Sequence, residues 1–165
     1  MLKLTLTGDL GVLAWIESRR ALLTAALVER INYWDQRLQQ RIQQKLSGDV
    51  LKQRTGKLKR SIEVIPATVD EEAGVISGRV VGAGGPAWYG KLHEYGTPPK
   101  TYTIVPVNKK ALRFIIDGVV LFRKSVTVTR GLPERSFMRS SQSELKPDII
   151  AGLRQTVYQV FSAKP

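Results

Sequence analysis

The sequence predicts an α+β fold with a long N-terminal helix, an antiparallel β-sheet of hairpins and a C-terminal helix. Three observations lead to this class. Apolar residues recur at helical spacing over residues 23–46, alternation with a period of two begins at residue 61, and Asp117-Gly118 separates two apolar runs. A chain of 165 residues suits one domain with its own core and is short for two. We therefore expect a single domain over residues 1–165.

The first long element is a helix over about residues 14–47, preceded by a possible short strand at residues 2–6. Its apolar face has steps of three and four and comprises Leu23, Leu27, Ile31, Trp34, Leu38, Ile42 and Leu46. Ser47-Gly48-Asp49 predicts its end. Such a helix is on the order of 40 Å long, so either part of one face packs against a neighbouring subunit or the helix spans its own sheet. Both alternatives stay open.

The sheet is expected over about residues 61–130, after a basic loop at residues 54–60. Apolar and polar residues alternate over residues 61–69, and a second strand is expected over residues 75–82, so the two predict an antiparallel hairpin around a polar turn. Residues 82–85 then form a glycine-rich loop.

A short helix or aromatic turn is expected over residues 87–95, ending at Gly96. We expect a positive φ at Gly96, which glycine tolerates at little cost. We also expect Glu94 to bond backbone donors or an arginine at this turn. Pro98 and Pro99 prevent the helix from continuing.

The remaining strands are expected at residues 102–105, 111–116, 119–122 and 125–129. Asp117-Gly118 between the middle two predicts a tight two-residue hairpin. A loop over residues 132–139 leads into the C-terminal helical segment, which covers about residues 136–162. Pro147 is expected to open its final helix, because proline suits the first helical position. The apolar face of that helix comprises Ile149, Ile150, Leu153, Val157, Val160 and Phe161.

The charge balance narrows the classes of partner. There are 26 Lys and Arg against 14 Asp and Glu, a net charge of +12, so the chain should attract nucleic acid or acidic protein surfaces. The basic excess is concentrated in residues 19–60 and 100–139. The candidate contacts with DNA or an acidic partner are Arg37, Arg41, Lys45, Arg54, Lys57, Arg60, Lys109, Lys110, Arg123 and Lys124. The simpler interpretation of this charge is that the protein has two basic faces, which only keep it in solution.

Other classes receive little support. No cysteine is present, which excludes disulfides and thiol nucleophiles. No apolar run is long enough for a membrane span, and the N-terminus does not resemble a signal peptide, so synthesis in the cytoplasm is expected. The single histidine, His93, lies in an aromatic and glycine-rich stretch without a recognisable nucleophile motif, so we expect no enzymatic activity. We expect no metal and no cofactor, since no convergent set of ligands is apparent.

Three motifs follow one another along the chain. The first is Thr55-Gly56-Lys57-Leu58 with Ser61-Ile62. The second runs from Tyr89 to Thr97 and contains His93, Glu94, Tyr95 and Gly96. The third is Arg135-Ser136-Phe137-Met138-Arg139. In this order and spacing they resemble the HK97 gp10-like tail-component family of bacteriophages, over roughly residues 50–160. The chain has Ser136 where that family usually has proline, and Ser140 where a second proline is common.

The resemblance implies a non-enzymatic structural protein of the virion, at the head-tail junction or in the tail. It would act as a neck, tail-completion or tail-terminator protein, in a homo-oligomeric ring of six or twelve copies. Its partners would be the head connector or stopper and tail proteins, with the DNA of the channel as a further candidate and no membrane. The protein would be made in the host cytoplasm. It also implies that Phe137 is a buried anchor. Our candidate contacts between neighbouring copies are residues 82–85 and 100–130. The alternative function is that of a basic protein that binds DNA non-specifically.

Overall fold

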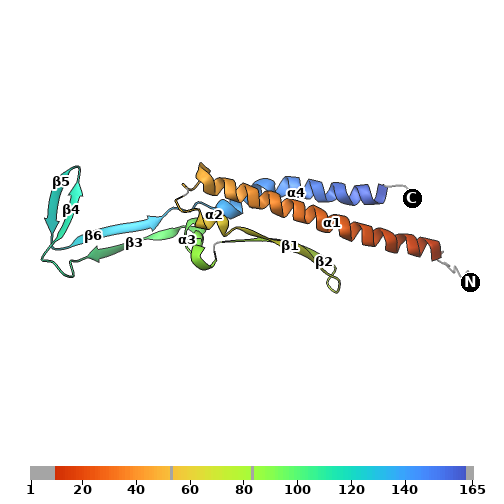
Figure 1. Cartoon of the computed structure of the whole chain (residues 1–165), viewed down its shortest axis with the longest axis horizontal. Helices are drawn as coiled ribbons and strands as arrows, with labels where there is room; N and C mark the ends of the chain where they lie inside the picture. Colours follow the sequence, from red (N-terminus) through yellow and green to blue (C-terminus); the bar gives the residue numbers. More distant parts are fainter. Residues whose placement is uncertain (1–9, 53, 83, 163–165) are drawn as a thin grey trace, which may run out of the picture. The chain divides into compact units, whose positions relative to one another are not determined.

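The computed structural model describes residues 10–52, 54–82 and 84–162. It confirms the α+β class, with a long N-terminal helix, antiparallel strand pairs and a C-terminal helix (Figure 1). The chain divides into two compact units. The first comprises Met1–Trp88 with Phe137–Pro165, and the second comprises Tyr89–Ser136. The strand expected at residues 2–6 lies outside the described residues.

The first unit is organised by helix α1 (Leu10–Gln44), which continues into one π-helical turn, η1 (Lys45–Asp49). The predicted stop is confirmed, because Gly48 has φ 148°, a backbone conformation that breaks the helix. The predicted apolar face is also confirmed. Ile42 and Leu46 are buried, and the other members of that face are half-buried.

Helix α4 (Phe137–Ser162) lies beside α1 and runs antiparallel to it (Figure 1). The prediction that Pro147 opens the last helix is wrong, because Pro147 lies inside one continuous helix. A proline inside a helix destabilises the helix, and packing offsets this effect here. Phe137 in the first turn is fully buried, and the turns after it contact α1. Pro147 itself is exposed, so its ring faces solvent.

Side chains of α1 bond α4 along its length. Nη1 of Arg19 donates to the carbonyl of Val160 (2.9 Å), and Nε of Arg30 donates to Oγ1 of Thr156 (3.0 Å). Further along α1, the ring of Trp34 approaches α4 at Gly152. A Cβ on Gly152 would collide with the indole, so the close approach needs glycine at this position. Of the predicted apolar face of α4, Ile149, Leu153 and Val160 are half-buried, whereas Ile150, Val157 and Phe161 are exposed.

The hairpin of β1 (Glu63–Asp70) and β2 (Val75–Val81) packs against α1. The register of β1 shifts between Ile65 and Thr68, and the amide freed at Ala67 donates to Oδ1 of Asn32 on α1 (2.8 Å). Further along α1, Nε2 of Gln39 donates to the carbonyl of Ile62 (2.7 Å). Helix α1 therefore packs along strands of its own chain, which is the second of the two alternatives expected for this helix.

Two short helices complete the first unit. Residues 54–60 were expected to be a loop, but Lys57–Arg60 forms a single helical turn, α2. Gly56 precedes it with φ 70°, and the amide of Arg60 donates to the carbonyl of Gly56 (3.0 Å). The 3₁₀-helix η2 (Gly85–Ala87) follows the glycine-rich loop.

The second unit consists of α3 (Gly90–Tyr95) and four strands. Strand β3 (Thr97–Ile104) pairs with β6 (Val126–Leu132), and β4 (Leu112–Ile116) pairs with β5 (Val119–Arg123). The antiparallel pairing is confirmed, but the strands form three separate two-stranded sheets rather than one sheet over residues 61–130.

The two turns of this unit differ in how well the sequence predicts them. Asp117 (φ 49°) and Gly118 (φ 81°) both have positive φ, which confirms the tight hairpin. Strand β3, expected from residue 102, begins at Thr97 instead. The register shift between Thr97 and Lys100 accommodates Pro98 and Pro99, which have no amide to donate to a ladder.

Candidate functional site

The first motif forms a buttressed turn beside an open pocket. Leu58 and Ile62 are buried, and Ser61 Oγ donates to the carbonyl of Leu58 (2.8 Å). Gly56 is also buried. Gly82 lets Ile62 approach the start of the glycine-rich loop, since a Cβ there would collide with the Ile62 side chain. The apolar members of the motif thus form local core, and its basic member, Lys57, remains exposed.

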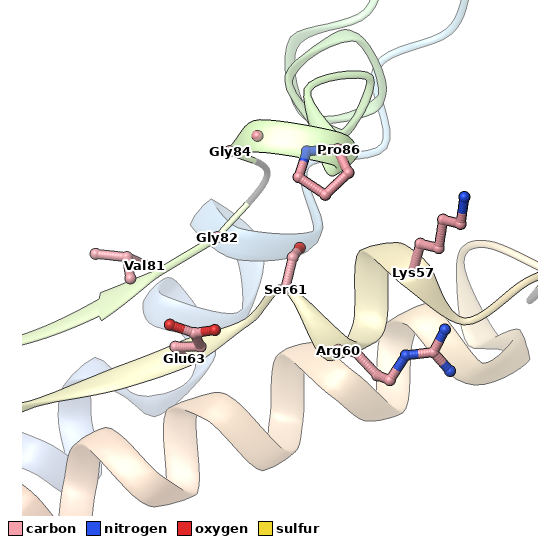
Figure 2. Close-up of a pocket in the computed structure, with 9 residues that line it drawn as sticks. Lys57, Arg60, Ser61, Glu63, Val81, Gly82, Gly84 and Pro86 are labelled. Carbon is pink, nitrogen blue, oxygen red and sulfur yellow. The ribbon is translucent and has the colours of Figure 1, made fainter.

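The pocket beside this turn has a volume of about 620 Å³. We call it the basic pocket; its lining residues are Lys57, Arg60, Ser61, Glu63, Val81, Gly82, Gly84, Gly85 and Pro86. Figure 2 shows the charged ends of Lys57 and Arg60 on one side and the Glu63 carboxylate on the other. Nη2 of Arg60 donates to the carbonyl of Thr55 (3.2 Å), which positions the guanidinium at the rim.

Within the second unit, the second motif bonds Arg135 and Ser136, the first two residues of the third motif. The amide of Arg135 donates to the carbonyl of His93 (2.9 Å), and the amide of Ser136 donates to the carbonyl of Glu94 (3.2 Å). Two main-chain bonds therefore join the end of α3 to the segment before α4. Glu94 is buried with 4% of its surface exposed, Phe137 is fully buried as expected, and Tyr95 is exposed.

Gly96 has φ 69° and ψ 179°, which confirms the positive φ expected there. This region of backbone conformation is almost exclusive to glycine. A Cβ on Gly96 would also lie 2.8 Å from the amide nitrogen of Glu134 and the carbonyl oxygen of Leu132. The hydroxyl of Thr97 accepts a hydrogen bond from the Leu132 amide (2.9 Å), so the motif fixes the base of the β3–β6 pair.

The structure explains why Ser136 stands where the family that the chain resembles usually has proline. Ser136 has φ 45°, whereas the proline ring fixes φ near −65°, and the Ser136 amide is used as a donor. A proline is incompatible with this turn. Ser140, the second departure, accepts a hydrogen bond at Oγ from Nζ of Lys45 (2.7 Å).

The side chain of His93 is half-buried, which distinguishes it from an exposed histidine. Its ring packs edge-on to Tyr89, with centroids 6.3 Å apart. Burial lowers the pKa of His93 below its ordinary value, and the nearby positive charge of Arg135 lowers it further. Within the described part of the chain, Nδ1 of His93 has no hydrogen-bond partner. The imidazole is therefore neutral at neutral pH.

The ten candidate basic residues differ in exposure and in whether they bind a carboxylate. Lys45 is buried and binds Glu144 at 2.6 Å, and Arg41 binds the same carboxylate at 2.8 Å. Both therefore connect α1 to α4. The others are exposed: Arg37, Arg54, Lys57, Arg60, Lys109, Lys110, Arg123 and Lys124. In the second unit the register of β4 and β5 pairs Leu112 with Arg123, so the two dibasic pairs, Lys109-Lys110 and Arg123-Lys124, flank the same end of the hairpin.

The β4–β5 hairpin presents an apolar surface that the sequence analysis did not single out. Ile115 pairs with Val120, and Arg113 pairs with Phe122, on the face opposite to Phe114 and Leu121. The three apolar members of this face, Ile115, Val120 and Phe122, are 58%, 40% and 64% exposed. We call these three residues the hairpin face. Strand alternation around Asp117-Gly118 was the signal that would have identified it.

Across the described residues 89–136, no hydrophobic side chain is fully buried. The apolar residues of this unit thus lack a core of their own. Among the described residues no helix is long and apolar enough to cross a membrane, and no group of three or more acidic or histidine side chains is placed to hold a metal ion.

Comparison of the chain with protein-family models, with curated proteins and with solved structures finds no match.

Proposed function

We propose that this chain is a structural virion protein of a tailed bacteriophage, acting at the head-tail junction by assembling into a ring. In that role it is a neck, tail-completion or tail-terminator protein whose partners are the head connector or stopper, tail proteins and further copies of itself. The observation that carries the proposal is the hairpin face, an apolar surface in a unit without a buried hydrophobic side chain.

An isolated two-stranded hairpin is marginally stable in water. Single exposed apolar residues are ordinary, but neighbouring ones on one face of a hairpin indicate a partner surface. Ile115 and Val120 are cross-strand partners, and Phe122 lies two residues further along the same face. Burying each such side chain contributes about 1.5–3 kcal/mol, enough for this face to dominate an interface.

The strands themselves also offer pairing. Each two-stranded sheet has two edges, and the edge groups are not paired with another strand within the described residues. Such edges pair readily with strands of a neighbouring chain. When the two contacting surfaces differ and the rotation closes, repetition of the contact gives a ring. The three motifs that resemble the HK97 gp10-like family point to the same role.

The experiment is native mass spectrometry of the full chain and of the double variant Ile115→Ser with Phe122→Ser. We expect a closed oligomer for the unaltered chain and monomer for the variant, with the same far-ultraviolet circular dichroism. Val107→Ser is the matched control, because Val107 is 92% exposed in the same unit but lies outside the hairpin face. An oligomer that survives the double variant would contradict the proposed role of this face.

Non-specific DNA binding is the second candidate, favoured by the dibasic pairs Lys109-Lys110 and Arg123-Lys124. All four side chains are exposed at one end of the hairpin. Neutralising several phosphates would make affinity for a duplex fall steeply as salt rises. Fluorescence anisotropy with a labelled duplex from 50 to about 200 mM salt tests this candidate. Replacing the four side chains by serine should then remove the binding.

A further inference from the structure

The β1–β2 hairpin has opposite charges at its two ends. At the start of β1 lies the basic pocket, with Lys57 and Arg60 at its rim. At the far end of the hairpin lies a turn with three consecutive carboxylates, Asp70, Glu71 and Glu72, which we call the acidic turn.

Two of these carboxylates form no ion pair among the described residues. Oδ1 of Asp70 accepts the amide of Ala73 (3.0 Å), so Asp70 stabilises the turn. Glu71 and Glu72 are exposed. The acidic turn therefore presents two carboxylates to solvent.

The basic pocket is complementary to such a turn. Lys57 forms no ion pair within the described part of the chain, and the guanidinium of Arg60 has donors left after its one bond to Thr55. Glu63 lies on the opposite side of the pocket (Figure 2), so an incoming carboxylate is attracted to the side of Lys57 and Arg60 and repelled from the other. A volume of about 620 Å³ is large enough to accept two side chains of a tight turn.

The two charged ends cannot meet within one chain. Strand β1 runs from Glu63 to Asp70, and at a rise of about 3.3 Å per residue its ends are about 23 Å apart. Helix α1 packs along this hairpin, which keeps it extended. A surface that pairs one charged end with the other therefore belongs to another molecule.

We propose that the acidic turn of one copy of this chain docks in the basic pocket of the next copy, with Glu71 and Glu72 bound by Lys57 and Arg60. The contact joins two different surfaces at opposite ends of one hairpin, so it is a head-to-tail contact of the kind that closes rings. The inference rests on the proposed assembly function and supplies it with a second, polar contact besides the hairpin face.

A cross-linking experiment tests the contact, since the chain contains no cysteine. Lys57→Cys and Glu72→Cys are prepared as separate full-length variants and mixed at equal concentration under oxidising conditions. Both positions are exposed, so neither substitution disturbs a core. We expect a disulfide-linked dimer in the mixture and at most traces in either variant alone. Lys57→Cys mixed with Ser77→Cys is the control, because Ser77 is exposed in the middle of β2. Linkage no greater than in this control overturns the proposal.

Charge reversal provides an independent measurement. Lys57→Glu with Arg60→Glu in one variant, or Glu71→Lys with Glu72→Lys in another, should each weaken self-association about tenfold, since two exposed ion pairs become repulsive. Mixing the two reversed variants should restore association between them. If the reversals leave association unchanged and the first instead abolishes binding to a DNA duplex, the pocket contacts phosphates and the proposal is wrong.

The outcomes separate this inference from the proposed function. A closed oligomer without the Lys57–Glu72 link would overturn the docking of the acidic turn and leave the assembly function standing. A chain that stays monomeric and gives no link at any concentration would overturn both. A link in a chain that never forms a closed oligomer would support the contact and contradict the ring.

Discussion

The carboxylate of Asp35 on α1 lies directly over Gly78 of β2. A Cβ built on Gly78 would collide with Oδ2 of Asp35 and with Cγ2 of Ile31. The absence of a side chain at Gly78 is therefore what allows the helix to approach the hairpin closely. This contact positions the hairpin whose two ends carry the basic pocket and the acidic turn.

Gly78→Ala should destabilise the chain by about 1–3 kcal/mol, because the added methyl group overpacks the contact between α1 and β2. The measurement is urea denaturation followed by circular dichroism. Gly84→Ala is the matched control, since Gly84 has an extended backbone and open space around its Cβ position. Equal midpoints for the two variants would contradict the account of this contact.

The ionisation of Asp35 should affect stability in one direction. Burial raises the pKa of Asp35 above its ordinary value of 3.8, and Oδ2 has no hydrogen-bond partner among the described residues. A raised pKa in the folded state means that folding favours the protonated form. Its contribution is fully present below pH 3.8 and is lost as pH rises through the folded pKa.

Asp35→Asn should consequently be more stable than the unaltered chain at pH 7, and this gain should disappear at about pH 3. Thermal unfolding at both pH values measures it. A variant less stable than the unaltered chain at pH 7 would show that the charged carboxylate has a partner that stabilises it.

Glu144 should show the opposite dependence on pH. Hydrogen bonds from Lys45 and then from Arg41 lower the pKa of Glu144 below 4.5. A lowered pKa means that its contribution is present above pH 4.5 and is lost as pH falls through the folded pKa. Because Lys45 is buried, neutralising its partner leaves a charge with only the Ser140 hydroxyl to bind.

Glu144→Gln should therefore destabilise the chain at pH 7, and the difference should shrink as the unaltered Glu144 becomes protonated at low pH. Thermal unfolding between pH 7 and about pH 3 measures this trend. The same deficit at every pH would attribute the effect to packing instead of charge.

Ser136→Pro introduces the residue that the resembling family usually has, and it should destabilise the second unit. Proline cannot adopt φ 45° and cannot donate the hydrogen bond to Glu94. We expect a cost of about 3 kcal/mol or more, measured by denaturant unfolding. Ser136→Gly, which permits the same φ, is the control and should be close to neutral. A proline variant as stable as the glycine variant would mean that the turn exists in another conformation.

Local patterns in the sequence predicted the local elements well. Helical spacing identified the buried side of α1, alternation identified β1 and β2, and Asp117-Gly118 identified a tight turn. These features depend on residues that are close in sequence, so periodicity and turn chemistry determine them.

Features that depend on distant residues were not predicted. The continuity of α4 through Pro147 comes from packing against α1, which local propensity does not report. The pair of Lys45 and Glu144 joins two helices far apart in sequence, and a count of basic residues gave no indication that Lys45 is buried. The hairpin face, by contrast, depends on residues close in sequence, because the turn at Asp117-Gly118 sets the register that places Ile115, Val120 and Phe122 together.

We propose that copies of this chain assemble into a closed ring. Native mass spectrometry of the purified full-length chain, with and without an added DNA duplex, measures this assembly. We expect one closed oligomer of defined stoichiometry, six or twelve copies, whose mass is unchanged by the duplex. A monomer or dimer that binds the duplex tightly, and releases it as salt is raised, would contradict it.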